Sequence, residues 1–327
     1  MIRASAPVRI CDIGGWTDTW FGGPGRVLNI AVRPGVEASI RATTGPDPVV
    51  LVVEAFGDRY PVVPAAPRAA RHPLLEAAVD ACPPPEGLTV EITVRSDVPA
   101  GCGTGTSAAV AVALLGGLAA LHPEQRSLRA IADAALHLEV DVLGAQSGIQ
   151  DQLSAAFGGI NFLEMETYPE ATMVPLPAWA ELGPRLSLVF LGRAHDSSAV
   201  HRQVVAGRGQ DALTRLRAAA VAARDAVVAQ DLGAFGRAMV ANSEAQRSLH
   251  DAVVGADARR VMELAAAQGA LGWKVNGAGG DGGSVTILSR SREARDELAR
   301  RVTDLDGRYR VLPIELSPTG LDVRGAL

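Results

Sequence analysis

Cysteine is scarce in this chain of 327 residues, which contains only Cys11, Cys82 and Cys102. The three cysteines show no metal-ligand spacing, and their odd number does not suit a framework of disulfide bonds. Both a disulfide-stapled fold and a cysteine-ligated zinc site are therefore disfavoured. We expect a reduced interior and a cytoplasmic protein.

An excess of positive charge is also missing. The formal net charge at pH 7 is −5, and Lys274 is the single lysine among basic residues that are otherwise arginines. A protein dedicated to nucleic acid needs a basic surface to offset the polyanionic backbone. We therefore expect no nucleic-acid partner.

The chain offers no convincing membrane span. Residues 99–121 carry no charge and could cross a bilayer by length alone. Their first third reads Pro-Ala-Gly-Cys-Gly-Thr-Gly-Thr-Ser, whose irregular backbone could not be satisfied in lipid. The remainder has the length of a buried helix, and the N-terminal residues lack the apolar run of a signal peptide. We expect no membrane association.

Several catalytic signatures are absent. No Gly-Lys-Ser/Thr follows a glycine-rich loop, so there is no Walker A motif. No Gly-x-Ser-x-Gly occurs, which disfavours a serine hydrolase. The six histidines show no zinc-type spacing.

The composition, with 48% hydrophobic and 20% charged residues, is that of a globular protein. Strands and helices alternate without a strict βαβ repeat, which predicts an α+β fold. A proline-rich stretch at 169–184 predicts a boundary between domains 1–175 and 176–327. Strands are expected at 25–42, 48–64, 88–94, 186–191, 273–275, 284–288 and 308–314. Helices are expected at 108–121, 128–143, 198–229, 232–249, 256–269 and 292–302.

Two glycine-rich segments could carry chemistry. Residues 99–109 follow a predicted strand and open a predicted helix, so their amides could cradle a phosphate. The alternative is a plain turn with a helix cap. Residues 277–282 form a literal Gly-x-Gly-x-x-Gly, but a strand follows them, so a glycine-rich hairpin competes with a dinucleotide site.

Two further segments are unusual. Residues 9–23 gather glycine pairs, tryptophans, aspartates and an arginine, which is typical of a binding loop, although a tight turn with core tryptophans would also fit. Glu139 and Asp151 lie in or beside an apolar region. Such carboxylates either serve a cation or a proton transfer, or they are solvated helix acids.

In this order, the segments resemble the GHMP small-molecule kinases. The counterparts of the family's three motifs are residues 7–32, residues 98–109 and the run Lys-Val-Asn-Gly-Ala-Gly-Gly-Asp-Gly-Gly at 274–283. Gly-Gly-Trp-Thr-Asp-Thr at 14–19 and Gly-Ile-Gln-Asp-Gln-Leu at 148–153 resemble the sugar 1-kinase branch of fucokinase and heptose-phosphate kinase. The resemblance implies an N-terminal domain like ribosomal protein S5 domain 2 and a ferredoxin-like C-terminal domain.

The resemblance also implies residue roles for a sugar 1-kinase that uses ATP and Mg²⁺. Asp151 matches the catalytic base and Arg9 the arginine beside it. Ser107 and Glu139 match the magnesium ligands. The expected nucleotide-binding residues are Pro99, Gly101, Cys102, Gly103, Thr104, Gly105, Thr106, Ser107, Ala108, Gly277, Ala278, Gly279 and Gly280. The expected substrate-binding residues are Gly15, Trp16, Thr17, Asp18, Gly148 and Arg193.

Some departures leave the acceptor open. Asp281 replaces a family glycine, so it either points away from the phosphates or changes that contact. Arg193, His195, His201 and Arg202 could hold the distal phosphate of a sugar phosphate, or simply form a solvated helix start. A kinase for a non-sugar acceptor, such as mevalonate or homoserine, and a non-catalytic sensor remain alternatives. The expected partners are ATP and a small sugar or sugar phosphate, and the expected state is a monomer or homodimer.

Overall fold

The computed structural model describes residues 1–325 except 46–48, 67–69, 195–199, 203 and 206–208. Its first lobe is organised around the long strand β2 (Gly25–Thr44), which runs antiparallel to β1 (Ile2–Ile13). The first part of β2 pairs with β6 (Ile160–Thr167), and its last part pairs with β5 (Leu88–Ser96). One strand thus links two halves of the sheet.

The remaining strands of this sheet extend both edges. In the described part of the chain the order is β13-β1-β2-β5-β3-β4, with β6 and β12 also paired to β2 and β7 paired to β6. These strands are β3 (Val49–Val53), β4 (Asp58–Val62), β7 (Glu170–Pro175), β12 (Glu315–Leu316) and β13 (Asp322–Arg324).

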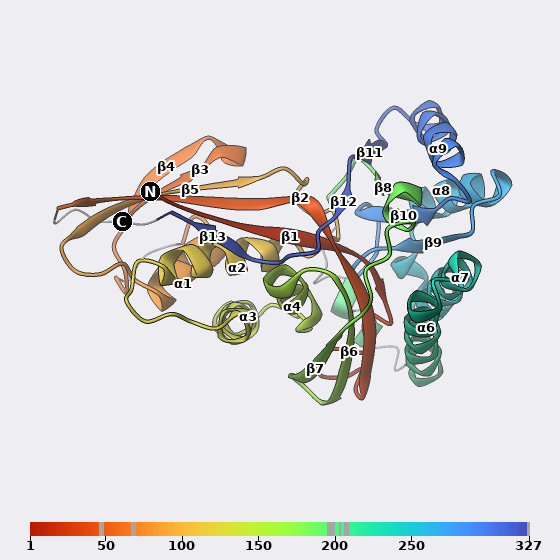
Figure 1. The fold of residues 1–327 in the computed structure, drawn as a ribbon, viewed down its shortest axis with the longest axis horizontal. Coiled ribbons are helices and arrows are strands. Elements are labelled where there is room, and N and C mark those ends of the chain that lie inside the picture. The colour runs from red at the N-terminus through yellow and green to blue at the C-terminus, as the bar shows by residue number, and fades with distance from the viewer. Residues whose placement is uncertain (46–48, 67–69, 195–199, 203, 206–208, 326–327) are drawn as a thin grey trace.

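Helices cover one face of the first sheet, as Figure 1 shows. They are α1 (Pro73–Ala81), α2 (Thr106–Ala119), α3 (Leu128–His137) and α4 (Gln150–Phe157). The helix α2 is built mainly from alanine, valine, leucine and glycine and is buried nearly all round, as its sequence requires. The π-helical turn η2 (Leu138–Val142) continues α3 and carries Glu139.

The second lobe has its own sheet in the order β11-β8-β10-β9. Its strands are β8 (Leu186–Phe190), β9 (Gly272–Val275), β10 (Ser284–Leu288) and β11 (Arg310–Leu312). Its helices are α6 (Gln210–Ala229), α7 (Leu232–Leu249), α8 (Ala256–Ala267) and α9 (Arg292–Leu305). Short 3₁₀ turns are η1 (Glu54–Phe56), η3 (Gly183–Arg185) and η4 (Asp251–Val253).

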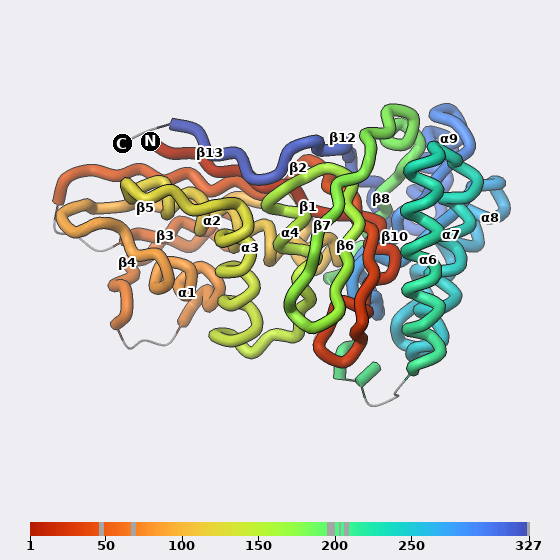
Figure 2. Tube along the Cα trace, turned by 60° about the horizontal axis from the view of Figure 1, so that its bottom comes forward, coloured from red at the N-terminus to blue at the C-terminus, as the bar shows by residue number. Residues whose placement is uncertain are grey.

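Among the described residues, one of two apolar clusters spans both lobes, and the other lies mostly in the second lobe. Figures 1 and 2 both place α6 and α7 side by side against the first lobe, and α6 contacts β2. The cluster that spans both lobes contains Ile30 of β2, Ala223 of α6 and Leu188 of β8. The lobes are therefore packed together rather than joined by a bare linker.

The expected α+β fold is confirmed, and most predicted elements lie close to their expected positions. The predicted boundary after 175 falls between the two sheets, but residues 315–324, expected in the second domain, return to the first sheet as β12 and β13. Figure 1 shows this tail running back to the N-terminus. No helix in the described residues has the length and apolar character needed to cross a bilayer.

Candidate active site

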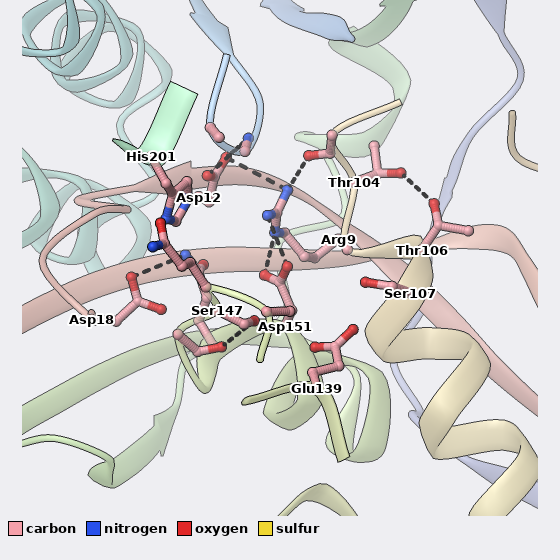
Figure 3. Close-up of a pocket in the computed structure, with 18 of the residues that line it drawn as sticks. Arg9, Asp12, Asp18, Thr104, Thr106, Ser107, Glu139, Ser147, Asp151 and His201 are labelled. Atoms are coloured by element: carbon pink, nitrogen blue, oxygen red, sulfur yellow. Dashed lines mark hydrogen bonds and ion pairs between the residues drawn. The ribbon is translucent and has the colours of Figure 1, made fainter. Parts of the chain in front are cut away.

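A cavity of about 320 Å³ opens where the loop before α2, the turn after β1 and the segment before α4 meet. Residues from the second lobe, Gly277 and His201, complete its wall. Segments that are far apart in the sequence therefore converge on one chamber. Figure 3 shows its polar side chains pointing toward one another.

An arginine–aspartate pair occupies the middle of the cavity. Arg9 of β1 donates from Nε to Asp151 Oδ1 at 2.7 Å and from Nη2 to Asp151 Oδ2 at 3.1 Å. Its Nη1 also donates to the carbonyl of Gly103. Arg9 is buried, whereas 18% of the Asp151 side-chain surface is exposed. The carboxylate is thus fixed in orientation and still open to a reactant.

The charges of this pair support each other. Burial opposes the charge on Arg9, but the carboxylates of Asp12 and Asp151 outweigh it and raise the pKa of the guanidinium. Burial raises the pKa of the Asp151 carboxyl, and the charge and hydrogen bonds of Arg9 limit that rise. Asp151 is therefore a more basic carboxylate than a solvated one, which suits a proton acceptor.

Asp151 lies directly against the glycine-rich loop. Gly105 has φ +67°, and a Cβ added to it would lie 3.0 Å from Asp151 Cγ. A side chain at this position would therefore be strained and would crowd the carboxylate. Asp151, which the resemblance matches to the catalytic base, therefore lies beside the loop that is expected to hold the phosphates.

The loop has the geometry of an anion cradle. The helix α2 begins directly after Gly105, and no side chain caps it, so its first amides remain available to a ligand. A Cβ on Gly277 would lie 2.8 Å from Gly103 O, so the two glycine-rich segments touch. These features fit the phosphate chain of a nucleotide.

Glu139 and Ser107 form a second polar group beside the loop, on the opposite side of Asp151 from Asp18 and His201 (Figure 3). Glu139 is buried and accepts hydrogen bonds from Gln152 and Ser107. Burial raises its pKa to about 6, and the hydrogen bond from Ser107 opposes that rise. Within the described ranges, no cluster of three histidine, cysteine or acidic residues could hold a metal. A carboxylate and a hydroxyl nevertheless fit Mg²⁺, which keeps waters and phosphate oxygens as its other ligands.

Asp18 lies across the cavity with Trp16 and Gln150. Gln150 Nε2 donates to Asp18 Oδ1 at 3.4 Å. A Cβ on Gly148 would lie 2.0 Å from Asp18 Oδ2, so only glycine allows this approach. Burial, and then the charge of Asp151, raises the pKa of Asp18 to about 7.

Asp12, to which the sequence analysis gave no role, connects the two lobes at the cavity wall. Lys274 Nζ, which is fully buried, donates to Asp12 Oδ1 at 2.8 Å, and the Gly277 amide donates to Asp12 Oδ2 at 3.0 Å. Arg9 Nη1 lies 3.9 Å from the same carboxylate. Two features of the sequence could have indicated this pair. Asp12 is an acidic residue among apolar ones, and Lys274 is the single lysine of the chain.

Most of the predicted site residues line the cavity together. These are Arg9, Trp16, Asp18, Gly101, Cys102, Gly103, Thr104, Gly105, Thr106, Ser107, Glu139, Gly148, Asp151, Gly277 and Ala278. The lining also includes residues that the sequence analysis did not place in the site, namely Asp12, Thr19, Ala145, Gln146, Ser147 and Gln150, and His201, which it had considered only for a distal phosphate.

Other predicted residues lie outside the lining. Thr17 is buried and donates to the carbonyl of Gly14, and Arg193 pairs with Asp257 at 2.7 Å. Gly280 donates its amide to Val253 O, and Asp281 is exposed with its carboxylate beside Gly255. Pro99, Ala108, Gly15 and Gly279 are likewise not among the lining residues. His195 lies outside the described residues.

Comparisons with known proteins agree with this architecture. Residues 68–159 match the model of the GHMP kinases N terminal domain, and residues 223–305 match that of the GHMP kinases C terminal region. A solved heptose 1-phosphate kinase from Bacteroides thetaiotaomicron superposes with a TM-score of 0.78 at 20% identity and full coverage of both chains. This likeness shows the two-domain fold.

Three curated proteins are similar to this chain in sequence. A D-glycero-alpha-D-manno-heptose 7-phosphate kinase from Campylobacter jejuni is 27% identical over 60% of each chain. A bifunctional fucokinase/GDP-fucose pyrophosphorylase from Arabidopsis thaliana is 27% identical over 92% of this chain and 31% of its own length. A mevalonate kinase from Thermococcus onnurineus is 30% identical over 74% of this chain and 70% of its own.

The chain therefore spans less than two thirds of the two sugar-kinase relatives. It nevertheless carries both family domains in order, and it aligns with most of a mevalonate kinase. The predicted resemblance is confirmed: the chain belongs to the GHMP kinase family.

Proposed function

We propose that this protein is an ATP-dependent sugar kinase that transfers the γ-phosphoryl group to an anomeric hydroxyl. The observation that carries the proposal is the position of Asp151, fixed by Arg9 between the glycine-rich loop and Asp18. A phosphoryl donor and a polyhydroxylated acceptor would then meet at one carboxylate. The homologous heptose 7-phosphate kinase and fucokinase support the sugar as acceptor class.

The roles of the residues follow from their chemistry. Asp151 accepts the proton of the attacking hydroxyl, which is otherwise a poor nucleophile at neutral pH. Arg9 keeps that carboxylate oriented and offsets charge on the transferred group. The amides of the loop and of the start of α2 hold the phosphates in line, since phosphoryl transfer depends mainly on positioning and charge neutralisation.

Bound Mg²⁺ would supply charge neutralisation on the phosphate oxygens. Glu139 and Ser107 would hold it, and Gln152 fixes the Glu139 carboxylate for that purpose. Asp18, with Gln150 and the backbone at Gly148, would hold the hydroxyls of the sugar.

A mevalonate kinase is the second candidate, because a relative with that name is 30% identical over most of this chain. Mevalonate is a carboxylate, so its binding calls for a cation. Among the described lining residues the guanidinium of Arg9 is already paired with Asp151, which favours the sugar.

The test is a coupled assay of ADP formation with MgATP and a panel of acceptors. The panel contains L-fucose, heptose, heptose 7-phosphate, mevalonate and homoserine. Turnover with a sugar, and a 1-phosphate product identified by ³¹P NMR, would support the proposal. Turnover with mevalonate or homoserine alone would refute it.

A further inference from the structure

The cavity contains buried polar atoms without a hydrogen-bond partner in the described structure. Asp18 Oδ2, Gln150 Oε1 and Gln146 Oε1 are acceptors of this kind, and Trp16 Nε1 is a donor. All four residues line the cavity, and Trp16, Asp18 and Gln150 are at most 5% exposed. Buried polar groups are normally satisfied, so these atoms indicate the complement of a ligand.

These three unpartnered acceptors and one unpartnered donor require a ligand that mainly donates hydrogen bonds. A hydroxyl can donate to Asp18, Gln150 or Gln146 and also accept from Trp16. A phosphate or carboxylate group offers only acceptors at neutral pH, apart from a monoprotonated phosphate, and would leave these oxygens unsatisfied.

The charges in the cavity also favour hydroxyl groups over a phosphate or carboxylate group. Its described lining residues carry four carboxyl groups, Asp12, Asp18, Glu139 and Asp151, and one guanidinium, Arg9. Arg9 contacts two of those carboxylates, and Lys274 pairs with Asp12 from outside the lining. A second anion next to Asp18 would be repelled by Asp151 and by the ionised form of Asp18, since these charges interact in a poorly solvated space.

Three arginines on the elements behind the acceptor turn are engaged elsewhere. Arg217 of α6 donates to the carbonyls of Gly22 and Pro24, and Arg26 pairs with Glu164 and Glu166. Arg193 pairs with Asp257. In the described structure these guanidinium groups stabilise the turn and the two lobes, and they do not line the cavity.

An aromatic surface closes the same side. The rings of Trp16 and His201 lie 4.5 Å apart, and Trp20 and Phe21 extend the cluster at 5.2 Å. Trp20 is 44% exposed, so the cluster reaches from the buried wall to solvent. Aromatic faces pack well against the apolar C–H faces of a sugar ring and add no charge.

From these observations we infer that the acceptor is an uncharged aldose, held by hydroxyl donation to Asp18, Gln150 and Gln146, and that sugars with a distal phosphate or carboxylate are discriminated against. This inference rests on the proposed sugar kinase function and narrows it. It separates the chain from its heptose 7-phosphate kinase relative, whose name gives a phosphorylated substrate.

The experiment compares matched acceptors with the full chain and MgATP. The pairs are heptose with heptose 7-phosphate, and L-fucose with galacturonate as the acidic probe. We expect kcat/KM for the better neutral sugar to exceed that for either charged sugar by at least about 100-fold. Equal or better use of a charged sugar would overturn the inference while leaving the sugar kinase proposal intact. Use of mevalonate or homoserine alone would instead overturn the proposed function.

A variant at Gln146 tests the charge argument without disturbing a fully buried group, because Gln146 is half-buried. Gln146→Lys places a cation in the cavity wall, and Gln146→Met is the matched neutral control. We expect Gln146→Lys to shift the ratio of kcat/KM values toward the charged sugar by about tenfold relative to Gln146→Met. An unchanged ratio would contradict the charge argument. Binding of MgADP, followed by thermal shift, verifies that both variants are folded.

Discussion

At the scale of single residues, the site depends on Asp151. Its carboxylate is oriented by two hydrogen bonds from Arg9 and remains partly exposed. Asp151→Asn keeps the shape of the side chain but removes the proton acceptor. We expect kcat to fall by about 10²–10⁴-fold, the usual contribution of general base catalysis, with MgADP binding retained in calorimetry.

The control for this prediction is Asp141→Asn. Asp141 lies on η2 and pairs with His137 in an exposed position. That variant should keep the wild-type kcat. An Asp151→Asn enzyme with near-native kcat would remove Asp151 from the role of base.

Asp18 predicts a pH dependence of stability. Its ordinary pKa of 3.8 is raised to about 7 in the folded protein, because burial disfavours the charged form. Between these values the folded state holds a proton that the unfolded chain releases, so this group's contribution to stability falls as the pH rises.

Asp18→Asn no longer titrates. We therefore expect the variant to gain at least about 1 kcal/mol relative to wild type between pH 5 and pH 8, the equivalent of roughly one pKa unit. Urea unfolding at the two pH values measures this difference. A relative stability that stays constant with pH would show that Asp18 ionises normally.

At the scale of elements, the start of α2 depends on a glycine. Gly105 has φ +67°, and its missing side chain leaves room for Asp151. Gly105→Ala should lose about 1 kcal/mol or more of unfolding free energy from backbone strain. It should also lower kcat by at least about tenfold, since small displacements of a catalytic group are costly.

Gly144→Ala is the matched control for this variant. Gly144 has φ +68°, but a Cβ there would meet no atom within 4 Å. It should show the loss of stability without the loss of kcat. If both variants lose kcat equally, the loss does not arise from crowding of Asp151 by a side chain at position 105.

At the scale of the whole molecule, a buried polar network joins the lobes. Lys274 binds Asp12, Asn276 Oδ1 accepts from the Cys11 amide, and Ser284 Oγ donates to Cys102 O at 2.6 Å. The second lobe thereby holds both β1 and the glycine-rich loop. This network places the glycine-rich loop relative to Arg9.

Breaking one side of the buried pair should be costly. Lys274→Met leaves the Asp12 carboxylate without its ammonium partner, and we expect a loss of about 3–5 kcal/mol in urea unfolding. The double variant Asp12→Asn with Lys274→Met removes both charges and should recover a large part of that loss. A double variant no more stable than Lys274→Met would mean that side-chain packing, not charge pairing, matters here.

The elements with a strong local pattern could be predicted from the sequence. The alternation in residues 88–94 became β5, and the apolar run after the glycine-rich loop became α2. The strand β1 and the helix α4 were not predicted, and residues 9–13 at the end of β1 had been interpreted as part of a binding loop. Their structure depends on long-range partners, since β1 lies between β2 and β13 and α4 packs under the first sheet.

Much of the site could be predicted too, because the glycine-rich loop, Asp151 and Asp18 belong to motifs with local order. Asp12, Gln146 and Gln150 could not be assigned, since their roles depend on which atoms face them across the cavity. Arg193 was expected near the substrate, yet its guanidinium pairs with Asp257 in the second lobe. The sequence alone does not specify which carboxylate a basic residue will pair with.

By itself, the sequence determined the family, the α+β class and the glycine-rich segments that line the cavity, because these reside in contiguous glycine, apolar and hydroxyl patterns. Only the tertiary structure decided how the lobes join, where the C-terminal strands pair and which polar atoms face the acceptor. Those features arise from contacts between residues more than a hundred positions apart, such as Arg9 with Asp151 and Asp12 with Lys274. Local patterning cannot specify such contacts, because they exist only once the shared core has closed.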